Sequence, residues 1–278
     1  MRTIFTTLAF ALAVSAGVPD ATAQDDRQIT NIVGDVYRFQ NRFHFNIFVV
    51  TDDGIVVTDP INAEAASWLE AELDSRFGKP VTHLIYSHSH GDHASGGAVF
   101  ADTAEVIAHA NAPEKIDGVA IETRFDDTLT FETGGSTIEL TFLGKGHGDD
   151  LIAMVVRPEN VAFVVDAVSA KRLPYRDFPR SDIDGWIEQV RTAEGLDFDV
   201  LAPGHGALGS KADVTATREY IESLREQVLA GLKAGKTEEQ LAVEILMANY
   251  KDWGQYDSWR ELNVRGMARW LIQTGAAN

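Results

Sequence analysis

The most constraining feature of the chain is a segment of seven residues that holds three histidines and one aspartate. This segment, residues 87–93, reads SHSHGDH and directly follows the apolar run 81–86, which has the composition of a buried strand. In an extended backbone the side chains of His88, His90 and Asp92 point the same way, and that of His93 points elsewhere. We therefore expect this one loop to face two neighbouring metal positions. Imidazole and carboxylate are natural ligands for a borderline cation such as zinc.

Three further candidate ligands lie where other predicted strands end. His147 stands between glycines, which let the backbone approach a crowded site, and His205 stands in a Pro-Gly-His-Gly segment. Asp166 ends an apolar strand, where a carboxylate has no use in a core. A single histidine at a strand end is usually structural, and we interpret His83 and His109 in that way. Five histidines and two aspartates, all in loops that leave strands, favour a metal site over coincidence.

Composition narrows the classes of partner and of ligand. The chain has 278 residues and no cysteine, so disulfides, thiolate nucleophiles and cysteine-bound metals are excluded. Its 24 Lys and Arg against 42 Asp and Glu give a formal net charge of −18. Such a charge argues against nucleic acid and anionic membranes as partners. A small-molecule substrate is expected instead, and the oligomeric state stays open.

The first 23 residues have the pattern of a secretory signal. Arg2 precedes an apolar run over 4–18, and an A-x-A pattern ends at Ala23. The alternative is a membrane anchor, for which the apolar run is short. We predict cleavage after residue 23, export to the periplasm or the medium, and no membrane association of the mature chain.

The rest of the chain divides into two parts. Two β-rich stretches with interspersed helices, at 63–77 and 182–193, predict an α/β fold built as a layered sandwich over residues 24–209. Beyond Gly209 the pattern becomes helical. Thr237 and Gln240 form a capping box that opens one of these helices. We expect residues 210–278 to form a helical C-terminal extension packed on the sandwich.

The motif HSHGDH at 88–93, followed by His147, Asp166 and His205, resembles that of the metallo-β-lactamase-fold hydrolases, over roughly residues 33–209. The resemblance implies a four-layer αβ/βα sandwich with the site at one edge, between the sheets. It implies two zinc ions per chain, with iron or manganese as alternatives. It further implies that Asp59 hydrogen-bonds a ligand imidazole from outside the ligand set. The implied ligands are His88, His90 and His147 for one metal, Asp92, His93 and His205 for the other, and Asp166 as a bridge.

The reaction implied by this resemblance is hydrolysis. A hydroxide bridging two zinc ions forms near neutral pH and attacks a carbonyl, and Asp92 is the candidate catalytic residue that takes the proton. The expected substrate has a small ester, lactone, thioester or amide bond, with β-lactams as one option. Without cysteine, the lactamase subclasses that bind their second metal through cysteine are excluded. Two alternatives stay open: an iron-dependent oxidoreductase resembling persulfide dioxygenases, and a non-catalytic zinc-binding protein.

The sequence identifies residues for substrate contact less clearly than it identifies the candidate metal ligands. Lys171, Arg172 and Tyr175 follow Asp166 in a loop where clustered cations could hold an anionic substrate group. The alternative is a solvated loop with surface ion pairs. His44 lies between two predicted strands, in a segment expected over the site. The aromatic segment 250–259 is expected to pack the extension onto the sandwich, with a substrate wall or a dimer contact as alternatives.

Overall fold

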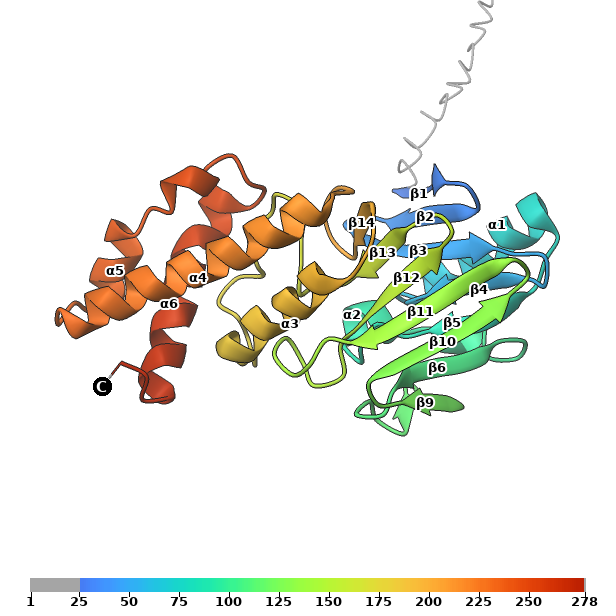
Figure 1. The fold of residues 1–278 in the computed structure, drawn as a ribbon, viewed down its shortest axis with the longest axis horizontal. Helices are drawn as coiled ribbons and strands as arrows, with labels where there is room; N and C mark the ends of the chain where they lie inside the picture. Colours follow the sequence, from blue (N-terminus) through green and yellow to red (C-terminus); the bar gives the residue numbers. More distant parts are fainter. Residues whose placement is uncertain (1–25, 278) are drawn as a thin grey trace, which may run out of the picture.

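The computed structural model describes residues 26–277. The predicted signal, residues 1–23, lies outside the described residues. Within the part of the chain that is described, no helix is both long and apolar enough to cross a membrane. Figure 1 shows two facing sheets with helices on their outer sides, and a group of helices, coloured orange to red, beyond one end of the sandwich.

The first sheet has seven strands and joins an antiparallel half to a parallel half. Its order is β1-β2-β3-β4-β5-β6-β9, antiparallel from β1 to β4 and parallel from β4 to β9. Its first strand was not among those predicted, because the sequence 27–33 lacks a clear apolar alternation. The strands are β1 (Arg27–Val33), β2 (Val36–Asn41), β3 (His44–Val50), β4 (Ile55–Thr58), β5 (Val81–Ile85), β6 (Glu105–His109) and β9 (Thr123–Phe125).

The second sheet has five strands in the order β10-β11-β12-β13-β14, and only its last pair is parallel. A separate two-stranded ribbon follows β6. The strands of the second sheet are β10 (Thr128–Thr133), β11 (Ser136–Phe142), β12 (Ile152–Arg157), β13 (Val161–Val164) and β14 (Val200–Pro203), and those of the ribbon are β7 (Lys115–Ile116) and β8 (Val119–Ala120).

Successive side chains of a strand point to opposite faces of the sheet, and so they enter different hydrophobic cores. In β12, Met154 and Val156 lie in the core between the two sheets, whereas Ala153 and Val155 lie in the core under the outer helices. Both faces are buried, so the strand is apolar throughout. Helix α1 (Ala63–Phe77) covers the first sheet and α3 (Ile183–Gly195) covers the second. The predicted α/β class, with a four-layer αβ/βα sandwich and a helical C-terminal extension, is confirmed.

The extension consists of α4 (Lys211–Lys233), α5 (Glu238–Glu244) and α6 (Tyr256–Gln273). The capping box of Thr237 and Gln240 is present at the start of α5, as predicted. One buried core contains side chains of the second sheet, of α3 and of the extension. The extension is therefore packed on the sandwich, and the boundary at 209–210 stays a prediction. The remaining short helices are α2 (Gly91–Ala94), η1 (Gly97–Val99) and η2 (Ala248–Tyr250).

Candidate metal centre

The histidine-rich segment leaves the end of β5 and then turns into a short helix. Because α2 begins at Gly91, the extended alternation stops before Asp92. The prediction that Asp92 points with His88 and His90 was therefore wrong. Helical backbone instead places Asp92 with His93, and the two imidazoles of the extended part lie on the other side. Segment 87–93 still faces two candidate metal positions. It does so because its backbone changes from extended to helical at Gly91, and not because side chains alternate along a strand.

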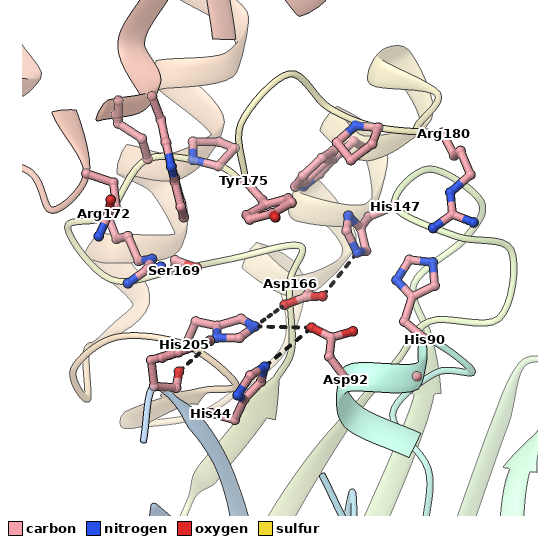
Figure 2. Close-up of a pocket in the computed structure, with 18 of the residues that line it drawn as sticks. His44, His90, Asp92, His147, Asp166, Ser169, Arg172, Tyr175, Arg180 and His205 are labelled. Carbon is pink, nitrogen blue, oxygen red and sulfur yellow. Dashed lines mark hydrogen bonds and ion pairs between the residues drawn. The ribbon is translucent and has the colours of Figure 1, made fainter. Parts of the chain in front are cut away.

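All seven candidate ligands meet at one edge of the sandwich and form two groups that share Asp166. Figure 2 shows five of them: His90, Asp92, His147, Asp166 and His205. Within each group the potential ligand atoms lie within 4.8 Å of one another. The groups are His88, His90, His147 and Asp166, and Asp92, His93, Asp166 and His205. This division is the one that the family resemblance implies, and the ligand roles themselves stay a prediction.

Asp166 presents one carboxylate oxygen to each group. Its Oδ2 lies 3.1 Å from Nε2 of His147 and 3.5 Å from Nε2 of His88. Its Oδ1 lies 3.4 Å from Nε2 of His93 and 3.3 Å from Nε2 of His205. The residue follows β13 with φ of 56°, a left-handed conformation that is strained for a side chain of this kind. This backbone turn aims the carboxylate between the two groups of imidazoles.

Asp59 contacts residues of both groups of candidate ligands, directly or through Ser87. Its buried carboxylate accepts hydrogen bonds from the backbone N–H of Ser87 at 2.7 Å and from the Ser87 hydroxyl at 2.6 Å. Since that hydroxyl has only one proton, its oxygen must accept from Nδ1 of His88, 2.9 Å away. Asp59 Oδ2 also lies 3.5 Å from Nδ1 of His93. Asp59 thus lies beside two candidate ligands, but it is linked to His88 through the hydroxyl of Ser87, which the sequence analysis missed, and a direct hydrogen bond from Asp59 to a ligand imidazole stays a prediction.

These hydrogen bonds leave imidazole lone pairs facing a carboxylate. With its proton on Nδ1, His88 has a buried Nε2 that finds no hydrogen-bond partner among residues 26–277. His205 donates from Nδ1 to the carbonyl of Phe43 at 2.9 Å, so its Nε2 directs a lone pair toward Asp166 and toward Nε2 of His93, which is 3.2 Å away. Lone pairs and a carboxylate that converge in a buried site repel each other unless a cation lies among them. This donor set therefore fits divalent metal ions.

The pKa values at the site point to the same chemistry. Burial, with His88 and His147 nearby, lowers the pKa of His90 to about 4, and burial lowers the pKa of His205 as well. Both imidazoles are thereby kept neutral, which is the form that binds metals. Burial would raise the pKa of Asp166, but the imidazoles of His93 and His147 lower it well below its usual range.

In the group that contains Asp92 and His93, the pKa values also favour the presence of positive charge. The imidazole of His44, whose Nε2 lies 3.6 Å from Oδ2 of Asp92, is the main cause that lowers the pKa of Asp92 below its usual range. Burial opposes a charge on His93, yet Asp166 and Asp59 raise the pKa of His93 well above its usual value. A proton and a metal cation would compete for this imidazole. The two ionised carboxylates and the lone pairs of the buried imidazoles together favour the binding of cations at this site.

A cavity of about 870 Å³ lies over the two groups, and Figure 2 shows its labelled side chains. His44, Arg172 and Tyr175, the candidates for substrate contact, line it, and their contact with substrate stays a prediction. Lys171 does not line it and is exposed to solvent. Among the lining residues that the sequence analysis did not single out are Arg180 and Trp186, and Gln255 and Trp259 come from the aromatic segment 250–259.

The C-terminal aromatic segment packs the extension, as expected, and also lines the cavity, whereas its contact with substrate stays a prediction. Tyr250 and Trp253 stack around Tyr220 of α4, with ring centroids 4.9 and 5.9 Å from that of Tyr220, and so pack the extension. Trp259 lies in the first turns of α6 and lines the cavity. The extension is therefore part of the site.

Two buried side chains hold the loops that carry His147 and His205. Gln189 of α3 accepts from the backbone N–H of His147 and donates to the carbonyl of Gly144, both at 2.7 Å. Arg38 of β2 donates to the carbonyls on either side of His205, which are those of residues 203 and 206. Neither residue has a local sequence signal, since each acts on a segment more than 40 positions away.

Comparison with known proteins agrees with this geometry. The family model described as the metallo-beta-lactamase superfamily matches residues 41–205. The alpha subunit of 2,4-dinitroanisole O-demethylase from Nocardioides sp. (strain JS1661) is 28% identical over 232 residues, which cover 80% of this chain and 70% of the relative. Metallo-beta-lactamase type 2 from Bacteroides fragilis is 26% identical over 250 residues, covering 80% of this chain and 98% of the relative.

Among solved structures, a metallo-beta-lactamase from Pontibacter korlensis superposes with a TM-score of 0.62 at 19% identity, covering 70% of this chain and 99% of that one. This similarity concerns the fold. Because the family model spans more than half of the chain and includes the whole set of candidate ligands, the chain belongs to the metallo-β-lactamase superfamily. It is an enzyme of the hydrolase type, with residues suited to divalent metal ions.

Proposed function

We propose that this chain is an exported hydrolase that uses two zinc ions to cleave a small ester, lactone, thioester or amide bond. The observation that carries the proposal is the placement of Asp166. Its two oxygens face two groups of imidazoles at distances of 3.1 to 3.5 Å, which suits a carboxylate shared by two cations. The export rests on the sequence pattern of residues 1–23 alone.

The residues that would hold the ions are those of the two groups. Bound zinc would supply Lewis-acid chemistry, which lowers the pKa of water and polarises a carbonyl. The chain itself supplies a base. Asp92 lines the cavity with a side chain that is 53% exposed, and the imidazole of His44, 3.6 Å away, lowers the pKa of Asp92. Because this carboxylate is open to the cavity, we infer that it relays a proton from water to a leaving group there, and its low pKa favours the release step.

The cavity favours a small substrate with an anionic group. Its volume of about 870 Å³ suits a small molecule, and aromatic side chains form much of its wall. Arg172 and Arg180 line it, and neither forms an ion pair with a carboxylate anywhere in residues 26–277. In a chain with a net charge of −18, two arginines left free beside a metal centre support binding of a carboxylate or sulfonate.

The test is the metal content of the mature chain, residues 24–278, together with turnover on a panel of esters, thioesters, lactones and β-lactams. We expect two zinc ions per chain and metal-dependent hydrolysis of at least one class. Asp166→Asn should lose both metals, whereas Asp149→Asn, an exposed carboxylate in the loop after His147, should keep both. One iron per chain with oxygen consumption would instead identify an oxidoreductase. Bound zinc without turnover of any class would identify a non-catalytic protein.

A further inference from the structure

The loop of residues 168–180, which joins β13 to α3, carries the arginines of the cavity but has an unfavourable backbone. Lys171, Arg176, Phe178 and Arg180 all have positive φ, between 47° and 58°. Each such residue costs about 1 kcal/mol relative to ordinary backbone. Four in thirteen residues show that the loop conformation must be stabilised by contacts from outside the loop.

Those contacts come from the C-terminal extension. The backbone N–H of Leu173 donates to the carbonyl of Gly254 at 3.0 Å, and the N–H of Gly254 donates to the carbonyl of Lys171 at 2.9 Å. This short parallel bridge brackets Arg172. On α6, a Cβ at Gly266 would lie 2.3 Å from the backbone oxygen of Asp177, so only glycine allows the loop to approach the helix this closely.

Asn263 of α6 is the central contact. It is fully buried, and its Nδ2 donates to two loop carbonyls, that of Pro174 at 3.1 Å and that of Arg176. Its Oδ1 accepts from the hydroxyl of Tyr220 on α4 at 2.7 Å. The amide is thereby fixed in orientation, with both donors used by the loop. Asn263 joins two helices of the extension to the loop that faces the cavity.

The loop of residues 168–180 places the guanidinium of Arg172 over the ring of Trp259. The guanidinium of Arg172 lies 4.8 Å from the ring centroid of Trp259, and the ring of Tyr175 meets Trp259 edge-on at 5.2 Å. Stacking fixes the guanidinium plane and leaves its N–H edges for a ligand. Figure 2 shows Arg172 beside Ser169 and His205, at one side of the cavity, with Arg180 at the other.

We propose that the helical extension builds the subsite that binds the anionic group of the substrate, with Asn263 as its positioning residue and Arg172 as the residue that contacts the anion. This inference rests on the proposed hydrolase function. It adds that the extension and not the metal centre selects substrates with a carboxylate or sulfonate remote from the bond that is cleaved. Asn263 touches neither substrate nor metal and acts through the loop.

Asn263→Asp is the decisive variant. It keeps the size and the acceptor for Tyr220 but replaces the two donors by an oxygen that repels the loop carbonyls. Val228→Ala is the matched control, because Val228 is fully buried in the core of the extension and its truncation destabilises α4 without removing a contact to the loop. The probes are 4-acetoxybenzoate, an anionic ester, and phenyl acetate, its neutral counterpart.

For Asn263→Asp we expect KM for 4-acetoxybenzoate to rise roughly tenfold, the worth of about one charge-assisted hydrogen bond, with KM for phenyl acetate and the zinc content unchanged. Arg172→Met should reproduce this difference between the two esters, and Lys171→Met, which removes a neighbouring charge outside the cavity, should not. In Asn263→Asp alone, the amides of residues 168–180 should exchange hydrogen faster. Val228→Ala should change neither readout.

An equal loss on both esters, or faster exchange of the loop in Val228→Ala as well, would overturn the proposal. Wild-type protein that cleaves neither ester would count against the proposed hydrolase and the anion subsite. In that case the exchange comparison still decides whether Asn263 positions the loop, because it requires no turnover. The two failures are thus distinguishable.

Discussion

Replacing Arg38 by Met should weaken the second metal position through the loop that carries His205. Arg38 is 7% exposed, and its guanidinium donates to the carbonyl of Pro203 at 2.9 Å and to that of Gly206 at 2.7 Å. It also stacks on Phe45, 3.6 Å from the ring centroid. Its environment is apolar enough that burial lowers the pKa of Arg38 to about 10.

The size of the effect follows from these contacts. A hydrogen bond with a charged donor contributes about 1.5–3 kcal/mol, and a stacked cation about 0.5–2 kcal/mol. Desolvation of the guanidinium offsets several kcal/mol of that gross gain. Because Met fills the space but leaves two carbonyls without donors, we expect a net loss of about 2–4 kcal/mol in the free energy of unfolding. Displacement of His205 should lower affinity at one metal position about 10–100-fold.

The assay is a zinc titration against a chromophoric chelator, combined with denaturant unfolding of the same samples. Arg38→Met should retain one zinc ion at wild-type affinity and bind the other weakly. Arg124→Met is the control, since Arg124 also donates to loop carbonyls, those of Ala110, Ala112 and Pro113, but away from the site. Two zinc ions bound at wild-type affinity by an Arg38→Met protein that is destabilised as expected would refute the reasoning.

Three other predictions test separate parts of the molecule. Asp59→Asn should lower zinc affinity about 10–100-fold in chelator competition by weakening the hold on His88 and His93, whereas Asp74→Asn, on the exposed side of α1, should not. Burial lowers the pKa of His83 from its usual value of about 6.5, so the unfolded chain binds more protons as the pH falls below that value, and stability is lost. His83→Phe should therefore show a shallower loss of unfolding free energy between pH 7 and 5 than wild type, and equal slopes would contradict this assignment. Removing metal with dipicolinate should lower Tm, since zinc at about 1,000 times its Kd adds about 4 kcal/mol to the native state, and an unchanged Tm would count against a metal site.

Most of the fold was predictable because its strands are buried on one or both faces and so carry strong apolar patterns. Helix α1 begins and ends where the spacing of Ala66, Leu69 and Leu73 predicted. Strand β1 was missed because it is an edge strand with mostly exposed side chains, which leaves no periodic signal. The sequence predicts the last helix over residues 262–272, but α6 begins at Tyr256, because Tyr256 packs on the core of the extension and Trp259 lines the cavity, which disturbs the pattern of a surface helix.

The candidate ligands were predictable for a chemical reason. His88, His147 and Asp166 are polar residues at the ends of buried strands, where no packing role explains them. The position of Asp92 was not predictable from alternation, because a helix of four residues interrupts the strand geometry inside the motif. Ser87, Arg38 and Gln189 were missed because their partners are distant in sequence or are backbone atoms, and neither leaves a pattern in the sequence.

The metal centre and the loop of residues 168–180 are held by different kinds of contact, and they should therefore respond differently to substitution of their side chains. The metal centre depends on side chains, such as Asp59 and Ser87 below His88, so most substitutions there would alter the donor geometry. The 168–180 loop is held through its backbone carbonyls by Asn263 and through backbone pairing with Gly254. Side chains that the loop directs into the cavity can therefore be replaced without loss of these hydrogen bonds. The metal chemistry of this fold should consequently be harder to change by substitution than its preference among substrates.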